Sequence, residues 1–74
     1  MEEKLKQYIG KKVHITFESK KHKCIYNLTG ILTGVDWQWS CFTDATYDYP
    51  FMAYKIDMVN TMRIRSVEEV NNGA

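Results

Sequence analysis

Residues 28–36 read LTGILTGVD, a run of strand-forming residues interrupted by two glycines and closed by an aspartate. Glycine weakens the interior of a strand, and it is favoured where the strand bends sharply or where another backbone comes close. Gly30 and Gly34 therefore predict that a long strand over about residues 24–35 is strongly bent. Such a strand can belong to both halves of a small, highly curved barrel.

A short helix is predicted before this strand, over about residues 2–9. Leu5, Tyr8 and Ile9 recur at helical spacing. Acidic residues fill the first turn, and Gly10 can end the helix. Two turns are not stable in isolation, so the apolar side of the helix must lie on the barrel or on a neighbouring subunit.

The rest of the chain reads as further strands. Residues 12–18 alternate between apolar and polar side chains, as in a half-buried strand, and the basic stretch 19–23 makes the hairpin connection. The predicted fold is thus mainly β, with a short N-terminal α-helix and a strongly bent five-stranded antiparallel small barrel over about residues 12–67. The remaining expectations are a strand over 41–43, a polar loop over 44–50, strands over 51–59 and 61–67, and a frayed tail over 68–74.

The chain of 74 residues is long enough for one small domain with a marginal core, because a domain of this size buries only about 60% of its unfolded surface. Disulfides, a metal or oligomerisation usually compensate. Cys24 and Cys41 are too few for a disulfide scaffold and are expected to be buried thiols in a reducing cytoplasm. Together with His14 and His22 they lack zinc-ligand spacing, so we expect no metal or cofactor. Oligomerisation remains, and it fits a hydrophobic fraction of 45%.

No apolar stretch approaches the ~20 residues that cross a bilayer, and no linker divides the chain. The sequence therefore predicts one cytoplasmic domain over residues 1–74.

The net charge of +1 is unevenly distributed along the chain. Residues 1–23 carry seven lysines and three acids, whereas residues 24–74 carry three basic and six acidic residues. This asymmetry favours one electropositive face, which suits phosphate contacts and also fits an ordinary solvated surface.

The helix, the five strands and the bent second strand resemble the Sm and Sm-like proteins, including bacterial Hfq. The resemblance covers roughly residues 5–67 and is most specific in the first Sm motif, which has apolar, Gly, Leu, Gly, apolar and Asp positions in order. The residues at these positions are Leu28, Gly30, Leu32, Gly34, Val35 and Asp36.

This resemblance implies a ring of about five to seven copies of the chain, in which the fourth strand of one subunit pairs with the fifth of the next and every edge strand is covered. It also implies that single-stranded RNA binds around the pore, held by the loops between strands two and three and between strands four and five. The RNA-binding residues implied are Asp36, Trp37, Gln38, Trp39, Ser40, Tyr54, Lys55 and Arg65.

The first motif is followed by a departure from the family pattern. The family has a stacking His, Tyr or Phe two residues after the Asp and commonly an Asn two further on, whereas this chain has Gln38 and Ser40. Trp37 and Trp39 flank Gln38, so a shifted loop would present an indole for base stacking, an interaction worth ~1 to 3 kcal/mol per base. The alternative is that these tryptophans pack into the barrel or the subunit interface.

The second motif allows two alignments. Tyr54 and Lys55 resemble the Tyr-Lys-His of Hfq, with Ile56 in place of the His, whereas residues 64–66 resemble the Ile-Arg-Gly of eukaryotic and archaeal members. Either Lys55 or Arg65 would then line the pore, and a salt bridge is the alternative role for each.

An enzyme is not expected, because the sequence offers no nucleophile with a base, no paired carboxylates in a cleft and no metal site. Asp36 is better interpreted as a residue that organises its loop. The leading function is an RNA-binding ring. The rival is a ring that serves as a structural or protein-interaction module, which Gln38, Ser40 and the near-neutral charge favour. The third candidate is a monomeric SH3-like peptide binder. Light scattering would then give the mass of one chain.

Overall fold

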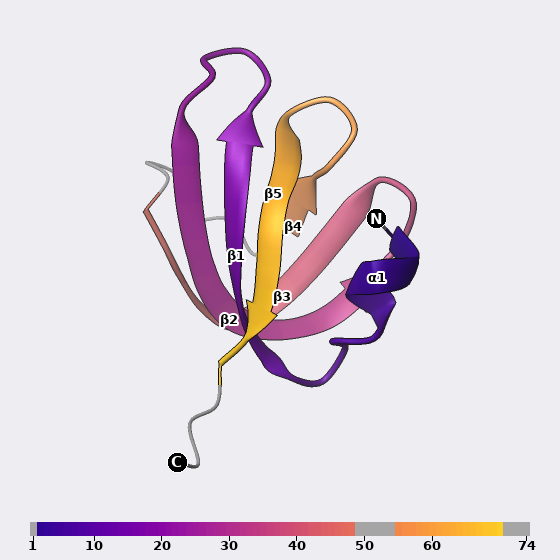
Figure 1. Cartoon of the computed structure of the whole chain (residues 1–74). Coiled ribbons are helices and arrows are strands. Elements are labelled where there is room, and N and C mark those ends of the chain that lie inside the picture. The colour runs from indigo at the N-terminus through magenta and orange to yellow at the C-terminus, as the bar shows by residue number, and fades with distance from the viewer. Residues whose placement is uncertain (1, 49–54, 71–74) are drawn as a thin grey trace.

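The computed structural model describes residues 2–48 and 55–70. One short helix precedes five antiparallel strands, which form a single sheet in the order β4-β3-β2-β1-β5 (Figure 1). The prediction of a mainly β fold with a short N-terminal helix and five antiparallel strands is confirmed. The elements are α1 (Glu2–Lys6), β1 (Lys12–Ser19), β2 (Ile25–Val35), β3 (Trp39–Tyr47), β4 (Lys55–Asp57) and β5 (Met62–Glu69).

The sheet curves strongly but is not closed. β4 and β5 are its two edge strands, and no strand pairing joins them within the described residues. Where the sequence predicted five strands closing into a barrel, the described part of the chain therefore forms an open, curved sheet. In the part of the chain that the structure describes, each of these two strands has a partner strand on one side only.

The bend of β2 comes at its glycines. β2 pairs with β1 along residues 25–31 and with β3 along residues 28–35, so its middle belongs to both halves of the sheet. The register between β2 and β3 shifts beside Gly30 and beside Gly34, as expected where a strand bends. A Cβ atom at position 30 would lie 2.8 Å from the Cβ of Ala45. The close approach of β3 therefore requires glycine at this position, and the predicted bend is confirmed.

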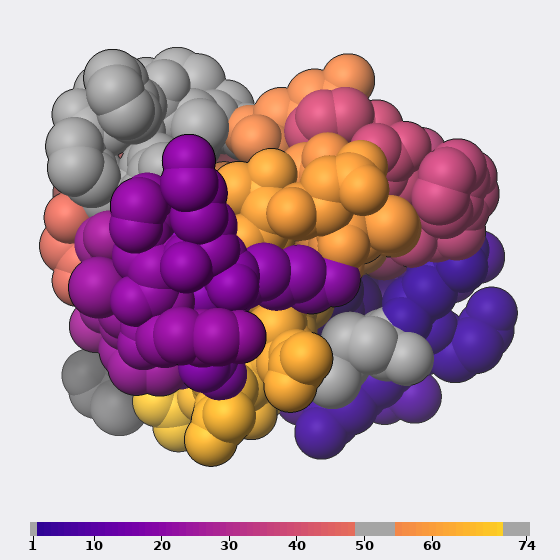
Figure 2. Space-filling view, turned by 90° about the horizontal axis from the view of Figure 1, so that it is seen from above, coloured from indigo at the N-terminus to yellow at the C-terminus, as the bar shows by residue number. Residues whose placement is uncertain are grey.

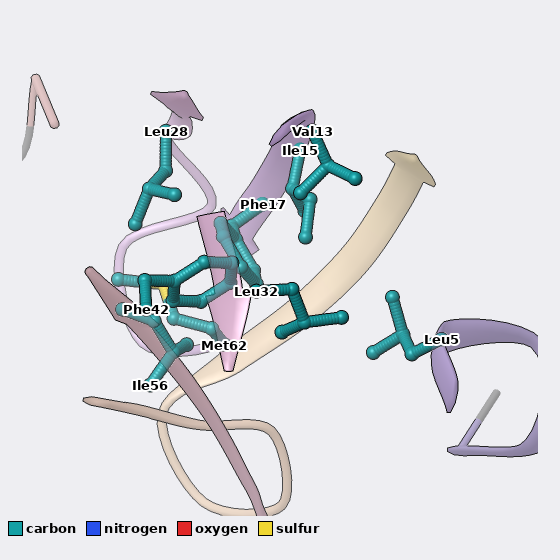
Figure 3. Close-up of a cluster of buried hydrophobic side chains, with 9 residues drawn as sticks. All are labelled: Leu5, Val13, Ile15, Phe17, Leu28, Leu32, Phe42, Ile56 and Met62. Carbon is teal, nitrogen blue, oxygen red and sulfur yellow. The ribbon is translucent and has the colours of Figure 1, made fainter. Parts of the chain in front are cut away.

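The hydrophobic core fills the inside of the curve (Figure 3). Alternate residues of β1 face it, as the sequence pattern predicted, and α1 adds Leu5, which is fully buried. Burying one such side chain contributes about 1.5–3 kcal/mol, so Leu5 holds a helix that could not form alone. The buried hydrophobic residues are Leu5, Val13, Ile15, Phe17, Leu28, Leu32, Phe42, Ile56 and Met62.

The helix ends earlier than predicted. α1 stops at Lys6, and residues 7–10 form turns in which the backbone N–H of Tyr8 donates to the carbonyl of Leu5. Gly10 has a φ of 88°, a conformation that favours glycine, and its N–H donates to the carbonyl of Leu32 on β2 at 2.7 Å. The prediction of a helix over 2–9 was wrong because the chain turns after Lys6 to join the sheet.

Several strand limits also differ from the prediction. β3 runs from Trp39 to Tyr47 rather than over 41–43, because polar residues of the expected loop pair with β2, as Thr46 does with Thr29. β4 is confined to 55–57 within the described residues, because Met58 and Val59 lie in a turn.

The C-terminal limit and the cysteines also need correction. β5 extends to Glu69, which pairs with Val13, so residues 68 and 69 of the expected tail belong to the sheet. Both cysteines are free. The expectation of buried thiols was wrong for Cys24, which is exposed on the hairpin between β1 and β2, while Cys41 is half-buried.

Candidate functional site

Asp36 organises the loop between β2 and β3. Its Oδ1 accepts the backbone N–H groups of Gln38 at 2.8 Å and Trp39 at 2.7 Å. The N–H of Asp36 donates in turn to the carbonyl of Trp39 at 2.9 Å. The hydrogen bonds from the backbone of Trp39 and Gln38 lower the pKa of Asp36. The interpretation of Asp36 as a loop organiser is confirmed, and its Oδ1 is occupied by the protein's own backbone.

Asp57 plays the same part in the turn between β4 and β5. Its Oδ1 accepts the N–H groups of Val59 and Asn60, each at 2.9 Å, and its Oδ2 accepts the side-chain amide of Asn60 at 3.2 Å. The hydrogen bond from the backbone of Asn60 is the main cause that lowers the pKa of Asp57. Asp57 therefore holds the first residues of the turn over 58–61 in place.

Gln38 joins these two loops. Its carbonyl accepts the N–H of Met58 at 2.7 Å, and its side-chain amide donates to Oδ2 of Asp57 at 3.3 Å. These two hydrogen bonds thus link the loop after β2 to the turn before β5. Gln38 acts here as a connector, and its amide N–H is already engaged within the protein.

Trp39 and Lys55 meet on neighbouring strands beside this connection. Trp39 is half-buried at the start of β3, and the ammonium group of Lys55 lies 4.6 Å from the centroid of its indole ring. At this distance the cation is attracted to the ring face. Both side chains line a hollow of about 200 Å³, together with Tyr47, Ile56, Asp57, Thr61 and Met62.

Trp37 is the most exposed aromatic residue of the loop. Its exposed fraction is 70%, so its indole is not packed into the core. It lines a second, larger hollow of about 490 Å³, which combines an aromatic surface and apolar side chains with two cations. The other lining residues are Glu2, Lys20, Met58, Arg63 and Ile64.

Ser40 and Arg65 lie apart from these two hollows. Ser40 is fully buried between the strands, and its hydroxyl has no hydrogen-bond partner among the described residues. Arg65 lies in β5 at an irregularity of the pairing with β1, and its guanidinium donates to the carboxylate of Glu18 at 2.9 Å. Tyr54 lies outside the described residues. The structure therefore brings together Asp36, Trp37, Gln38, Trp39 and Lys55 among the eight predicted site residues.

Three residues near Trp37 were not predicted from the sequence, namely Lys20, Met58 and Arg63. The sequence did carry a signal for one of them, because Lys20 belongs to the lysine-rich hairpin that accounts for part of the uneven charge. Met58 is brought near Trp37 by its bond to Gln38, and Arg63 is placed by its pairing with Glu18 of β1.

No protein-family model, curated protein or solved structure gives a significant match to this chain. The chemistry of the site is therefore argued from its own residues. No group of His, Cys, Asp or Glu within residues 2–48 and 55–70 is arranged to hold a metal ion. In the same residues, no helix has the length and hydrophobicity needed to cross a membrane. What the two hollows do offer is exposed aromatic surface beside cations.

Proposed function

We propose that this chain assembles into a Sm-like ring that binds single-stranded RNA. The observation that carries the proposal is the exposed indole of Trp37 at a hollow that Lys20 and Arg63 also line. An indole stacks on any base, and neighbouring cations contact the phosphates, which is the common design of single-strand binding sites. The cation of Lys55 over Trp39 provides a second such combination across the Gln38 connection.

The edges of the sheet support assembly. β4 and β5 lie at opposite edges, and each has one side without a partner strand in the described residues. An uncovered edge offers backbone groups for pairing with another chain. Pairing of β5 with β4 of the next copy covers both edges, and repetition of this contact closes a ring. A ring would also add to the small core of a chain of this length.

Titration of a fluorescently labelled oligouridine with the protein tests the RNA proposal. Fluorescence anisotropy is followed at two salt concentrations, with a duplex DNA of equal length as the comparison. We expect saturable binding to the single strand that weakens as salt rises, because phosphate contacts release counterions. An absence of salt-sensitive binding to oligouridine would contradict the proposal.

The rival function is a ring that binds protein or serves a structural role. It is favoured by Gln38 and Ser40, because the amide N–H of Gln38 is engaged with Asp57 and Ser40 is fully buried. At the positions where the family resemblance expects RNA contacts, Ser40 is therefore inaccessible and Gln38 is partly engaged within the protein. A ring of the expected mass that fails to bind oligouridine would favour this rival.

A further inference from the structure

The hairpin between β1 and β2 places basic side chains next to the Trp37 hollow. Lys20 and Arg63 line that hollow, and the same two residues line a small depression with Lys23 and Glu18. Because Lys20 and Arg63 line both, the cations Lys23, Lys20 and Arg63 lie along the same stretch of surface as Trp37. Figure 2 looks onto this end of the molecule, where the hairpin, the start of β5 and the loop after β2 follow one another across the surface.

Cations outnumber acids along this stretch of the surface. Within the described residues, Lys20, Lys23 and Arg63 form no ion pair. The two acids that line the same hollows have partners elsewhere, because Glu18 pairs with Arg65 at 2.9 Å and Glu2 pairs with Lys6 at 3.1 Å. Lys20 donates to the carbonyl of Val59, a neutral acceptor. A stretch of surface on which cations outnumber acids attracts a polyanion.

The hairpin is held in place on the body of the protein. The N–H of Lys20 donates to the carbonyl of Thr61 at 2.9 Å, which fastens the hairpin to the turn of 58–61. Within the hairpin, the N–H of Lys23 donates to the carbonyl of Ser19 at 2.8 Å. The sequence was also compatible with an ordinary solvated turn at these lysines. These bonds instead position the backbone of the hairpin on the same turn that Gln38 bonds.

We infer that Lys20, Lys23 and Arg63 form a phosphate track for a single strand of nucleic acid. The strand leaves its base contact at Trp37 and its phosphates pass over Arg63 and Lys20 toward the tip of the hairpin. This inference rests on the proposed function and adds the path that the nucleic acid follows on each subunit. The nucleic acid crosses the end of each subunit as well as following the loops.

The test compares two double variants that remove the same charge. Lys23→Asn with Arg63→Gln removes two cations of the track, and asparagine tolerates the φ of 61° at position 23. Lys4→Gln with Lys12→Gln removes two exposed lysines of α1 and β1 that line neither hollow. Urea denaturation and native mass measurement establish that both variants fold and assemble like the parent protein.

Two labelled probes separate phosphate contacts from base contacts. One is an oligouridine, and the other is an abasic strand of equal length, which carries phosphates without bases. With the track variant, we expect affinity for both probes to fall roughly tenfold at physiological salt, and the slope of log K against log salt to decrease by about 1.4, which corresponds to two lost phosphate contacts. The control variant should show less than a third of either effect.

The outcomes distinguish the track from the proposed function. If the parent protein binds both probes and the track variant weakens no more than the control, the track is wrong and RNA binding stands. The track stands and the proposed base contact fails if two results are found together. Binding of the abasic strand is weaker in the track variant, and binding of oligouridine is unchanged by Trp37→Ala. If the parent protein binds neither probe, both are overturned.

Discussion

The ammonium group of Lys55 lies over the indole ring of Trp39, 4.6 Å from its centroid. The pairing of β3 with β4 brings them together, because Trp39 faces Asp57 and Cys41 faces Lys55 in the register. The contact restrains a cation beside an aromatic ring at the mouth of the smaller hollow. In the proposed function, this cation contacts phosphate or the edge of a base.

Lys55→Ala should therefore reduce binding more than it reduces stability. Loss of an exposed cation–π contact costs about 0.5–1 kcal/mol of stability. Loss of one phosphate contact should lower the slope of log K against log salt by about 0.7 for a single strand. Urea denaturation and oligouridine titration measure the two effects, and Lys55→Arg is the matched control that keeps the charge. Equal slopes for the alanine variant and the parent protein would show that Lys55 does not contact the strand.

Trp37→Ala should weaken oligouridine binding with little effect on folding. The side chain is 70% exposed, so little packing is lost on its removal. Loss of one stacked base costs about 1–3 kcal/mol, or roughly 5- to 150-fold in affinity. Trp37→Phe retains an aromatic face and should recover most of the affinity. If the alanine variant binds as tightly as the parent protein, Trp37 is not a stacking residue.

Gly30→Ala should destabilise the protein by about 1–3 kcal/mol, because the added Cβ would lie 2.8 Å from the Cβ of Ala45. Gly34→Ala is the matched control, since a Cβ there meets no atom within 4 Å. Urea denaturation at one fixed protein concentration measures both variants, because assembly makes apparent stability depend on concentration. Equal stabilities for the two variants would contradict the close approach of β2 and β3.

Stability should fall in acid through the two loop aspartates. The pKa of Asp36 and of Asp57 is lowered from 3.8 in the folded protein by backbone hydrogen bonds. Each ionised carboxylate therefore stabilises the fold above pH 3.8, and this contribution is lost as the pH falls through the lowered pKa. Between about pH 6 and about pH 3, the urea midpoint of the parent protein should decrease more than that of Asp36→Asn with Asp57→Asn. Parallel curves would contradict this role.

Local patterns in the sequence predicted the strands well where they have a buried face. The alternation in residues 12–18 predicted β1, and the two glycines predicted the bent β2, because both patterns are visible within a few residues of sequence. Residues 44–47 were expected in a loop because they are polar, yet they continue β3 since their partners on β2 determine the pairing. The end of α1 was missed for a similar reason, because the bond from Gly10 to Leu32 is a tertiary contact.

The candidate site was predictable only in part. Asp36 follows the motif directly, and its role in the loop could be foreseen from the preference of Asp for bonding nearby backbone N–H groups. The sequence left open whether Trp37 and Trp39 are exposed or packed. In the structure, Trp37 is exposed and Trp39 is half-buried. The connection from Gln38 to Asp57 joins residues that are distant in the chain, so no local pattern reveals it. Arg63 and Trp37 line one hollow through the pairing of β5 with β1, which is also a contact between distant parts of the chain.

Native mass spectrometry of the protein with and without a short oligouridine tests the central claim most directly. We expect a closed assembly of about five to seven chains, each of 8.7 kDa. The mass of this assembly should increase by that of the bound oligouridine when RNA is added. A species with the mass of a single chain, or an assembly whose mass does not change with oligouridine, would contradict the claim that this chain forms an RNA-binding ring.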